Sequence, residues 1–233
     1  MTELTSARSQ ISDLQNELAI FDTVITLHYQ FKTSRWGKQN WTLAIPLRDY
    51  LYYRDKPRPT NFGELNSNTT HPYYIFAEYR TMATDPYDDE LIDSIIYQLN
   101  EVSATDNLSE LEKLRFILTF VQSLTYAEDI DTAPYNEYPR YPVETLFARG
   151  GDCEDTSILL AAILTAMGHD VALLLFEEFD HMGLGINFPV GYGNSWMHEG
   201  RRYWYLDTTG SQTIGWCSDE YAETSAYVYP VGR

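Results

Sequence analysis

The chain has 233 residues, of which 44% are hydrophobic and 15% aromatic, enough to fill the core of one large globular domain. Its 34 acidic residues against 16 basic ones give a formal net charge of −18 at pH 7. Because such a surface repels phosphate backbones and anionic lipid, the composition argues against a nucleic-acid partner and against membrane contact by this chain.

The sequence shows no leader or membrane-spanning segment. No apolar run reaches about 18 residues, and the first thirty residues lack the basic-then-apolar pattern of a signal peptide. We therefore expect a cytoplasmic protein, or a cell-envelope protein if an N-terminal anchor was removed. The two cysteines, Cys153 and Cys217, lack the spacing of zinc ligands or of a disulfide framework. Both are expected to be thiols, and no metal or cofactor is predicted.

A heptad pattern opens the chain. Between residues 4 and 21, apolar residues recur at alternating spacings of three and four: Leu4, Ala7, Ile11, Leu14, Leu18 and Phe21. This pattern is typical of a coiled coil, so residues 1–21 are predicted to form a helix that protrudes as a stalk or joins a homo-oligomer. The alternative is an amphipathic helix packed on its own domain, residues 22–233.

Extended segments are predicted to follow. The stretch 23–31 is dense in β-branched and aromatic residues, and 40–53 is predicted to be a second extended stretch, in which Pro46 marks an edge or a break. Residues 54–72 are punctuated by proline, asparagine and glycine, so they are expected to form a loop.

Two helices are predicted next. Residues 88–102 place their apolar side chains on one helical face. Residues 109–124 begin with Ser109 and Glu112, the spacing of a capping box, and are predicted to form a buried helix. A connection rich in proline and tyrosine then leads to a Gly-Gly pair and Cys153.

Cys153 is predicted to stand at the N-terminus of a buried helix. Residues 154–167 are apolar almost all round, which is typical of a helix in the middle of a core. Gly150 and Gly151 permit a sharp bend and the close approach of another segment. The positive end of the helix dipole favours a thiolate there, whereas the acidic residues on either side of Cys153 oppose it. A cysteine that only packs is the alternative.

A thiolate nucleophile needs an imidazole partner, and His181 is the preferred candidate among five histidines. It opens the alternating stretch 181–186, in which His181, Gly183 and Gly185 share one face of a strand. The two glycines leave room beside the ring for another element, such as the cysteine helix. His198 is expected in a turn between two strands and is the rival candidate for the base.

Asp207 supplies the third group. It stands at the end of a predicted strand, 202–207, and shares a face with Tyr203 and Tyr205. If this strand pairs with the His181 strand, the carboxylate can meet the far nitrogen of the ring. A turn-initiating aspartate is the alternative.

Taken in order, "GGDCEDTSILLAAILTAMG", "DHMGLGI" and "YWYLDTT" resemble the three motifs of the transglutaminase-like superfamily of papain-like thiol enzymes. The resemblance is strongest to its microbial branch of predicted cysteine proteases, and "YPRYPVETL" resembles the approach to the cysteine in that branch. The resemblance implies an α+β, papain-like core in which the cysteine helix packs on an antiparallel sheet. It also implies that Cys153 is the nucleophile, His181 the base, Asp207 the orienting acid and Asp155 a structural acid.

The function implied is hydrolysis of amide, peptide or isopeptide bonds in a protein or peptide substrate, through an acyl-enzyme. The Cys153 amide and a second donor, for which Tyr141 is a candidate, would hold the oxyanion. Acyl transfer on the same triad is a second possibility, since "RGGDCED" also resembles the cysteine motif of arylamine N-acetyltransferases. A non-catalytic protein-binding module is a third.

Overall fold

A computed structural model describes residues 11, 18–19, 22–58, 73–132 and 138–232. Most of the predicted heptad helix, residues 4–21, and most of the predicted loop, residues 54–72, lie outside the described residues. The boundary predicted between residues 21 and 22 therefore stays a prediction.

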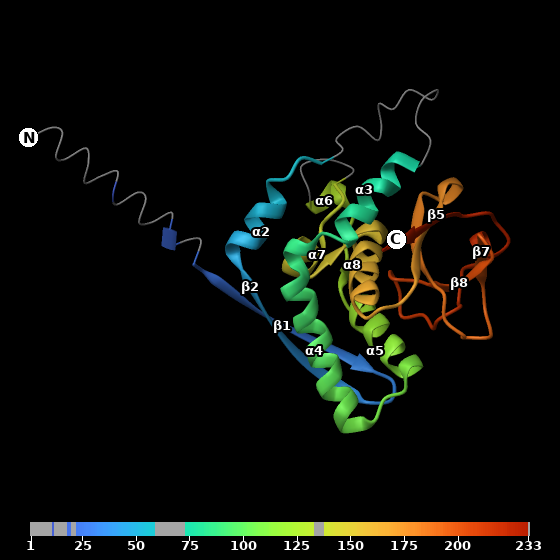
Figure 1. Cartoon of the computed structure of the whole chain (residues 1–233), viewed down its shortest axis with the longest axis horizontal. Coiled ribbons are helices and arrows are strands. Elements are labelled where there is room, and N and C mark those ends of the chain that lie inside the picture. The colour runs from blue at the N-terminus through green and yellow to red at the C-terminus, as the bar shows by residue number, and fades with distance from the viewer. Residues whose placement is uncertain (1–10, 12–17, 20–21, 59–72, 133–137, 233) are drawn as a thin grey trace, which may run out of the picture.

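Helices and strands alternate irregularly along the described chain (Figure 1). The longer helices are α2 (Leu47–Arg54), α3 (Tyr73–Ala83), α4 (Asp89–Asp106), α5 (Glu110–Gln122), α7 (Pro142–Ala148) and α8 (Cys153–Ala166). The short ones are η1 (Pro86–Asp88), α6 (Asp129–Thr132), η2 (Glu177–Phe179) and α9 (Asp219–Ala222). The strands are β1 (Val24–Thr33), β2 (Gly37–Pro46), β3 (Thr125–Tyr126), β4 (Gly150–Gly151), β5 (Val171–Phe176), β6 (His181–Ile186), β7 (Ser195–His198), β8 (Arg201–Leu206) and β9 (Tyr227–Val231).

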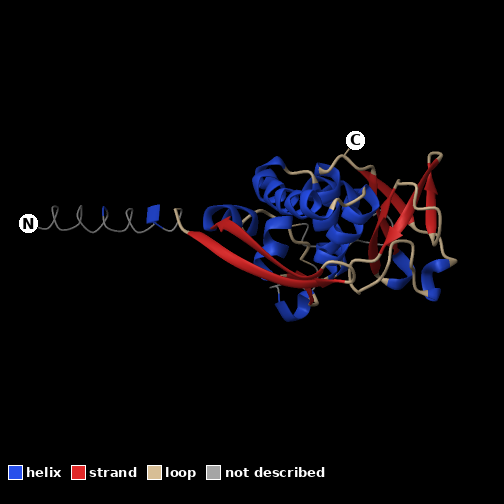
Figure 2. Ribbon diagram, turned by 90° about the horizontal axis from the view of Figure 1, so that it is seen from below, coloured by secondary structure: helices blue, strands red, loops and turns tan. Residues whose placement is uncertain are grey.

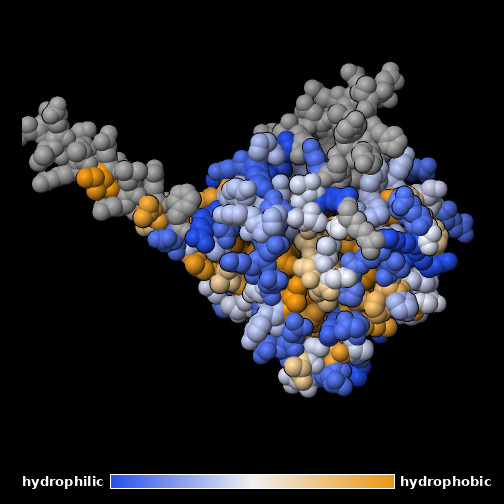
Figure 3. All heavy atoms as spheres, in the orientation of Figure 1, coloured by the Kyte–Doolittle hydropathy of each residue, from blue (hydrophilic) through white to orange (hydrophobic). Residues whose placement is uncertain are grey.

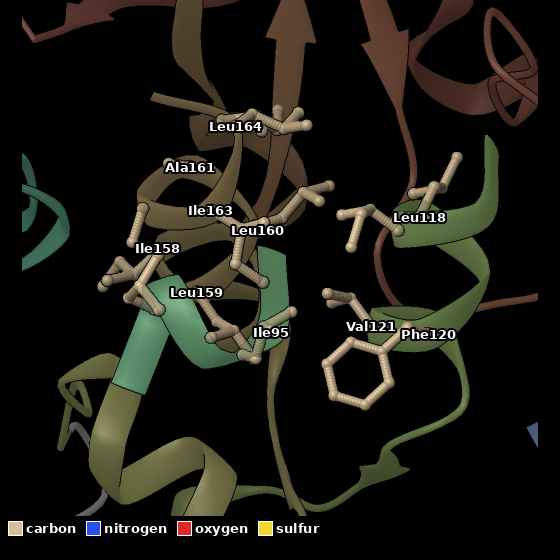
Figure 4. Packing of buried hydrophobic residues seen from close by; sticks show 14 of the residues in the cluster. Ile95, Leu118, Phe120, Val121, Ile158, Leu159, Leu160, Ala161, Ile163 and Leu164 are labelled. Atoms are coloured by element: carbon tan, nitrogen blue, oxygen red, sulfur yellow. The ribbon is translucent and has the colours of Figure 1, made fainter. Parts of the chain in front are cut away.

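Helix α8 is the centre of the core, as its apolar sequence predicts. It contacts α3, α4, α5 and α7 on its helical side and β5 and β6 on the other. Figure 4 shows its side chains facing Ile95 of α4 and Leu118 and Val121 of α5. Because apolar residues cover every side of α8, it is stable only where it is surrounded.

Strands β7, β8, β6, β5 and β9 form, in that spatial order, one sheet in which every neighbouring pair is antiparallel. It lies at one end of the domain (Figure 2). Met182, Leu184 and Ile186 belong to the core cluster that includes α8, whereas Leu174, Phe176 and Tyr205 form a second cluster. The α+β class predicted from the sequence, with a buried cysteine helix on an antiparallel sheet, is confirmed.

The strands β1 and β2 form a separate antiparallel ribbon alongside α4 and α5. Alternate residues of β1 are buried, and the ring of Phe31 lies 5.7 Å from that of Phe116 in α5. The prediction that 40–53 is extended holds as far as Pro46 and is wrong beyond it, because residues 47–54 form α2. Pro46 stands at the junction, where proline ends a strand and is tolerated before a helix.

Local signals elsewhere are confirmed. The hydroxyl of Ser109 accepts a hydrogen bond from the Glu112 amide, and the Glu112 carboxylate accepts one from the Ser109 amide, which completes the predicted capping box of α5. Within the described residues, no helix is both long and apolar enough to cross a lipid bilayer. The face drawn in Figure 3 is mainly hydrophilic, with apolar residues gathered near its middle.

Candidate active site

Cys153 is the first residue of α8. The two glycines before it, Gly150 and Gly151, allow other groups to approach the backbone closely. A Cβ at Gly150 would collide with the backbone carbonyl of Thr125, whose strand β3 pairs in parallel with β4. A Cβ at Gly151 would collide with the side chain of Asp155. The predicted need for close approach is therefore confirmed at both positions, and the approaching groups are β3 and the first turn of α8 itself.

A buried arginine holds this first turn in place. Asp155 is fully buried. Its carboxylate accepts a hydrogen bond from the Arg140 amide at 2.6 Å and forms an ion pair with the Arg140 guanidinium. The same guanidinium pairs with Asp129 at 3.1 Å. Burial and the Asp152 carboxylate raise the pKa of Asp155, and Arg140 opposes that rise. The structural role predicted for Asp155 thus depends on Arg140, which joins the "YPRYP" segment to the cysteine helix.

Asp129, Asp152 and Asp155 each bring one oxygen within 4.8 Å of the others, a spacing that could hold a metal ion. Arg140, however, already makes ion pairs with two of the three carboxylates. A metal ion at this place would therefore compete with the guanidinium for the same oxygens.

The Cys153 thiol donates a hydrogen bond to the Glu154 carboxylate, with 2.9 Å between Sγ and Oε2. Burial and the Glu154 charge raise the pKa of the thiol well above its usual range, and Asp152 adds to the effect. A backbone hydrogen bond with Met182 opposes it. Burial, with the acidic neighbours, thus opposes the helix dipole and favours the protonated thiol.

We expect Glu154→Gln to increase the reactivity of this thiol. Removing the negative charge beside the sulfur lowers its pKa, so the rate of alkylation of Cys153 by iodoacetamide at pH 8 should rise about tenfold, equivalent to about one pKa unit. The measurement uses a Cys217→Ala background, so that only Cys153 is labelled. Glu110→Gln, a change at the first turn of α5, is the matched control and should leave the rate unchanged. An unchanged or slower rate in Glu154→Gln would show that this carboxylate does not hold the proton.

His181 opens β6, and its ring lies with the second cluster. It stacks on Tyr221 with 5.0 Å between ring centroids and faces Phe176 at 6.1 Å. Its Nε2 lies 2.9 Å from the hydroxyl of Tyr205. Burial lowers the pKa of the ring, and the Asp207 carboxylate raises it. The ring is therefore neutral near pH 7 and able to accept a proton.

The space beside the glycines is filled differently from the prediction. The ring of Tyr205 lies where a Cβ of Gly183 would stand, and the Cβ of Tyr203 lies 2.7 Å from the position of a Gly185 Cβ. Two tyrosines of the neighbouring strand β8, not the cysteine helix, use this room. The strand alternation explains this: Met182 packs in the core cluster that includes α8, so the glycines between the alternate residues face the tyrosines of β8.

Asp207 follows β8 and is buried. Its Oδ1 accepts hydrogen bonds from the amide and the hydroxyl of Thr209, both at 2.9 Å. Among the described residues, neither the expected hydrogen bond between Cys153 and His181 nor the one between His181 and Asp207 is formed. Glu154, Tyr205 and Thr209 are the partners instead, and Asp207 acts on the ring through its charge.

Hydrogen bonds nevertheless tie the three motifs together. The hydroxyl of Ser157 in α8 donates to the backbone carbonyl of Met182 at 3.5 Å, and Thr156 lies 2.8 Å from the hydroxyl of Thr208. Met182 directly follows His181, and Thr208 directly follows Asp207. The first turns of the cysteine helix are thus anchored to the residues that come next after the other two candidates.

A hollow with a volume of about 460 Å³ lies beside this region. Its lining includes Thr125, Ala127, Arg140, Gly150 and Gly151. Cys153 itself is buried and is not among the lining residues, although Gly151 precedes it by two positions.

Other candidates lie elsewhere. His198 is the last residue of β7 and pairs with Arg201, so the predicted turn lies at the next two residues and not at His198 itself. The ring of Tyr141, the candidate oxyanion donor, lies 4.7 Å from the Lys56 ammonium and 4.9 Å from the Arg58 guanidinium, so its neighbours are not those of the thiol. Tyr126 pairs with Gly151, two residues before Cys153, and burial and then the thiolate form of Cys153 raise the pKa of its phenol to about 12. It is half exposed, and no sequence motif marks it.

No family model matches the chain, and no curated protein does. Among solved structures, it is similar to LapG of Legionella pneumophila in the calcium-bound form, with 24% identity over 51% of this chain and a TM-score of 0.34. The chain spans 63% of that protein's length. LapG without a stated ligand matches with 20% identity over 66% of this chain and 80% of its own, with a TM-score of 0.37. For the EGTA-treated form of LapG, the identity is again 20% and the TM-score 0.37, and the chain spans 78% of that protein's length. Similarity at this level assigns no chemistry to the chain.

Proposed function

We propose that this chain is a transglutaminase-like thiol hydrolase that cleaves amide, peptide or isopeptide bonds, with Cys153 as nucleophile, His181 as base and Asp207 as supporting acid. The observation that carries the proposal is the anchoring of α8. Its first turns are bonded to Met182 and Thr208, so a helix that starts with a cysteine is joined to the residues following a histidine and an aspartate. A cysteine buried only for packing requires none of these connections.

The reaction needs a proton acceptor for a thiol that rests protonated. Neutral His181 takes the proton from Sγ as the sulfur attacks the carbonyl carbon and a C–S bond forms. The imidazolium then gives this proton to the leaving nitrogen as the C–N bond breaks, which leaves a thioester. Water attacks the thioester, His181 accepts a proton from it, and that proton returns to sulfur as the acid product leaves.

The charge that develops on the substrate oxygen needs donors. The backbone N–H of Cys153 belongs to the first turn of α8, where amides have no intrahelical acceptor, and it can donate to the oxyanion. Tyr126 replaces Tyr141 as the candidate for the second donor, since its phenol is within electrostatic reach of the sulfur.

Two other functions stay open on specific grounds. If an amine replaces water in the second step, the same groups perform acyl transfer. A protein-binding module is favoured by the hydrogen bond from Cys153 to Glu154, because a thiol held in this way is a poor nucleophile. Turnover of a peptide or isopeptide library, with and without added amine, separates the three functions.

The histidine variants test the mechanism. His181→Ala should lower kcat/KM for the best library substrate by about 10²- to 10⁴-fold, since general-base catalysis contributes that much. His198→Ala should leave kcat/KM within a few fold, because this side chain lies at the end of β7. If His198→Ala abolishes turnover while His181→Ala does not, the base has been misassigned.

A further inference from the structure

The residue that makes the hydrogen bond to His181 is a tyrosine that the three-motif comparison does not single out. Tyr205 is fully buried, and its hydroxyl lies 2.9 Å from Nε2 of His181. It precedes Asp207 by two residues, and the alternation of β8 carried one residue past its end places both side chains on the same side. The place expected for the orienting carboxylate is thus taken by a phenol.

The backbone is arranged to admit this ring. In the β6–β8 register Tyr205 lies opposite Gly185, and its ring leans along β6 across Gly183. A Cβ at Gly183 would stand 2.8 Å from the Tyr205 hydroxyl oxygen and 2.9 Å from the ring carbon that carries it. Only glycine at 183 therefore lets the phenol reach the imidazole.

The other groups that face His181 cannot fix its orientation by a directional bond. Phe176 and Tyr221 contact the ring by stacking, and Asp207 acts through charge. In the part of the chain that the structure describes, the ring's one hydrogen bond goes to Tyr205. Nδ1 has no hydrogen-bond partner there, which leaves it as the nitrogen that can take the thiol proton.

A base can accept a proton only on an unprotonated nitrogen. For Nδ1 to accept from sulfur, the neutral ring must carry its hydrogen on Nε2, and that N–H must have an acceptor. The 2.9 Å contact with Tyr205 fits either direction, and in this tautomer the Tyr205 oxygen is the acceptor. Burial, followed by the Asp207 charge, raises the pKa of this phenol well above its usual range, so it stays neutral while it accepts.

We propose that Tyr205 is the positioning residue of the site: its hydroxyl oxygen accepts a hydrogen bond from Nε2–H of His181 and thereby sets the tautomer that leaves Nδ1 free to act as base. Asp207 contributes negative charge near the ring, not the hydrogen bond that sets the tautomer. This inference rests on the proposed function, because it specifies how the proposed base is held ready.

Tyr205→Phe tests the inference, since it removes one oxygen and keeps the ring. Two-bond ¹H–¹⁵N spectra of the histidine side chains report the tautomer without any substrate. Wild-type protein should show His181 with its proton on Nε2, and Tyr205→Phe should show a mixture of both tautomers. In turnover assays, kcat should fall about 10- to 100-fold with KM nearly unchanged, as expected when one hydrogen bond that fixes a base is lost.

Tyr203→Phe is the matched control. Tyr203 is also fully buried on the same face of β8, but its hydroxyl donates to Asp170 at 3.1 Å. This variant should keep both the His181 tautomer and kcat. Asp207→Asn provides a contrast: it should lower the pKa of His181, and with it the acid limb of the pH–rate profile, while the tautomer stays on Nε2.

The wild-type spectrum alone can overturn the inference, whether or not Tyr205→Phe folds. A His181 ring with its proton on Nδ1 excludes the proposed tautomer, and an unchanged tautomer in Tyr205→Phe excludes the proposed role of the hydroxyl. If no substrate turns over but the tautomer depends on Tyr205, the proposed hydrolase function fails while the hydrogen-bond assignment stands.

Discussion

Replacement of Arg140 by methionine should lower the free energy of unfolding by about 3–5 kcal/mol, which is typical when one partner of a buried ion pair is removed. The Arg140 side chain is 7% exposed, and its partners Asp155 and Asp129 are 0% and 4% exposed. Methionine fills most of the volume but leaves two buried carboxylates facing each other without a cation. The first turn of α8 is then repelled from α6, so the labelling of Cys153 should change as well.

The pH dependence of this loss has a definite sign. Burial and Asp152 raise the pKa of Asp155, and without Arg140 the pKa rises further. A carboxyl group whose pKa is higher in the folded than in the unfolded state stabilises the fold at low pH. That contribution disappears as the pH rises through the folded-state pKa. The stability difference between wild type and Arg140→Met should therefore be smaller at pH 5 than at pH 8.

Urea unfolding at several pH values measures this difference. Arg48→Met is the control, since Arg48 is half exposed and forms an ion pair with its neighbour Asp49 at 3.3 Å. It should leave the unfolding midpoint nearly unchanged, because exposed ion pairs contribute little. A difference for Arg140→Met that is small at all pH values, or that widens towards acid, would mean that the carboxylates do not depend on Arg140.

The parts of this protein that the sequence predicts are those that depend on local periodicity. Residues 154–167 carry apolar side chains on almost every side of a helix, which predicts a helix in the centre of the core. The structure has α8 at that position. The alternation in 181–186 correctly places His181, Gly183 and Gly185 on one face. The capping box at Ser109 is likewise a property of four consecutive residues.

What the sequence does not predict depends on partners distant in the chain. The alternation of polar and apolar residues predicts the strand face on which His181 lies, but not the side chain that contacts it. Tyr205, 24 residues further along the chain, fills the space that we expected α8 to fill. Arg140 meets Asp155 and Asp129 only after the chain has folded. Pro46 marks a break in 40–53, but it does not predict that residues 47–54 form a helix, α2, which packs on α7 almost a hundred residues away.

Replacement of Cys153 by alanine should abolish turnover, with kcat/KM reduced about 10⁴-fold or more, because no covalent intermediate can form without the sulfur. The fold should remain. Cys153 is buried at the helix start, but alanine removes only the sulfur and suits a first helical turn. Near-UV circular dichroism and the urea midpoint should therefore match wild type, while labelling by a thiol-directed activity probe should be lost.

Cys217→Ala is the matched control for this last variant. Cys217 is also a buried free thiol, in the second cluster with Phe176 and Tyr205, and burial followed by the Asp207 charge raises its pKa to about 12. The Cys217 sulfur is not at the N-terminus of a helix and has no proposed base as partner. Replacing Cys217 by alanine should therefore leave kcat/KM within a few fold. Full turnover by Cys153→Ala, or an equal loss in Cys217→Ala, would remove the basis for a thiol mechanism at the start of α8. Loss in Cys153→Ala alone, with the fold retained, would identify the sulfur at the N-terminus of this buried helix as the nucleophile.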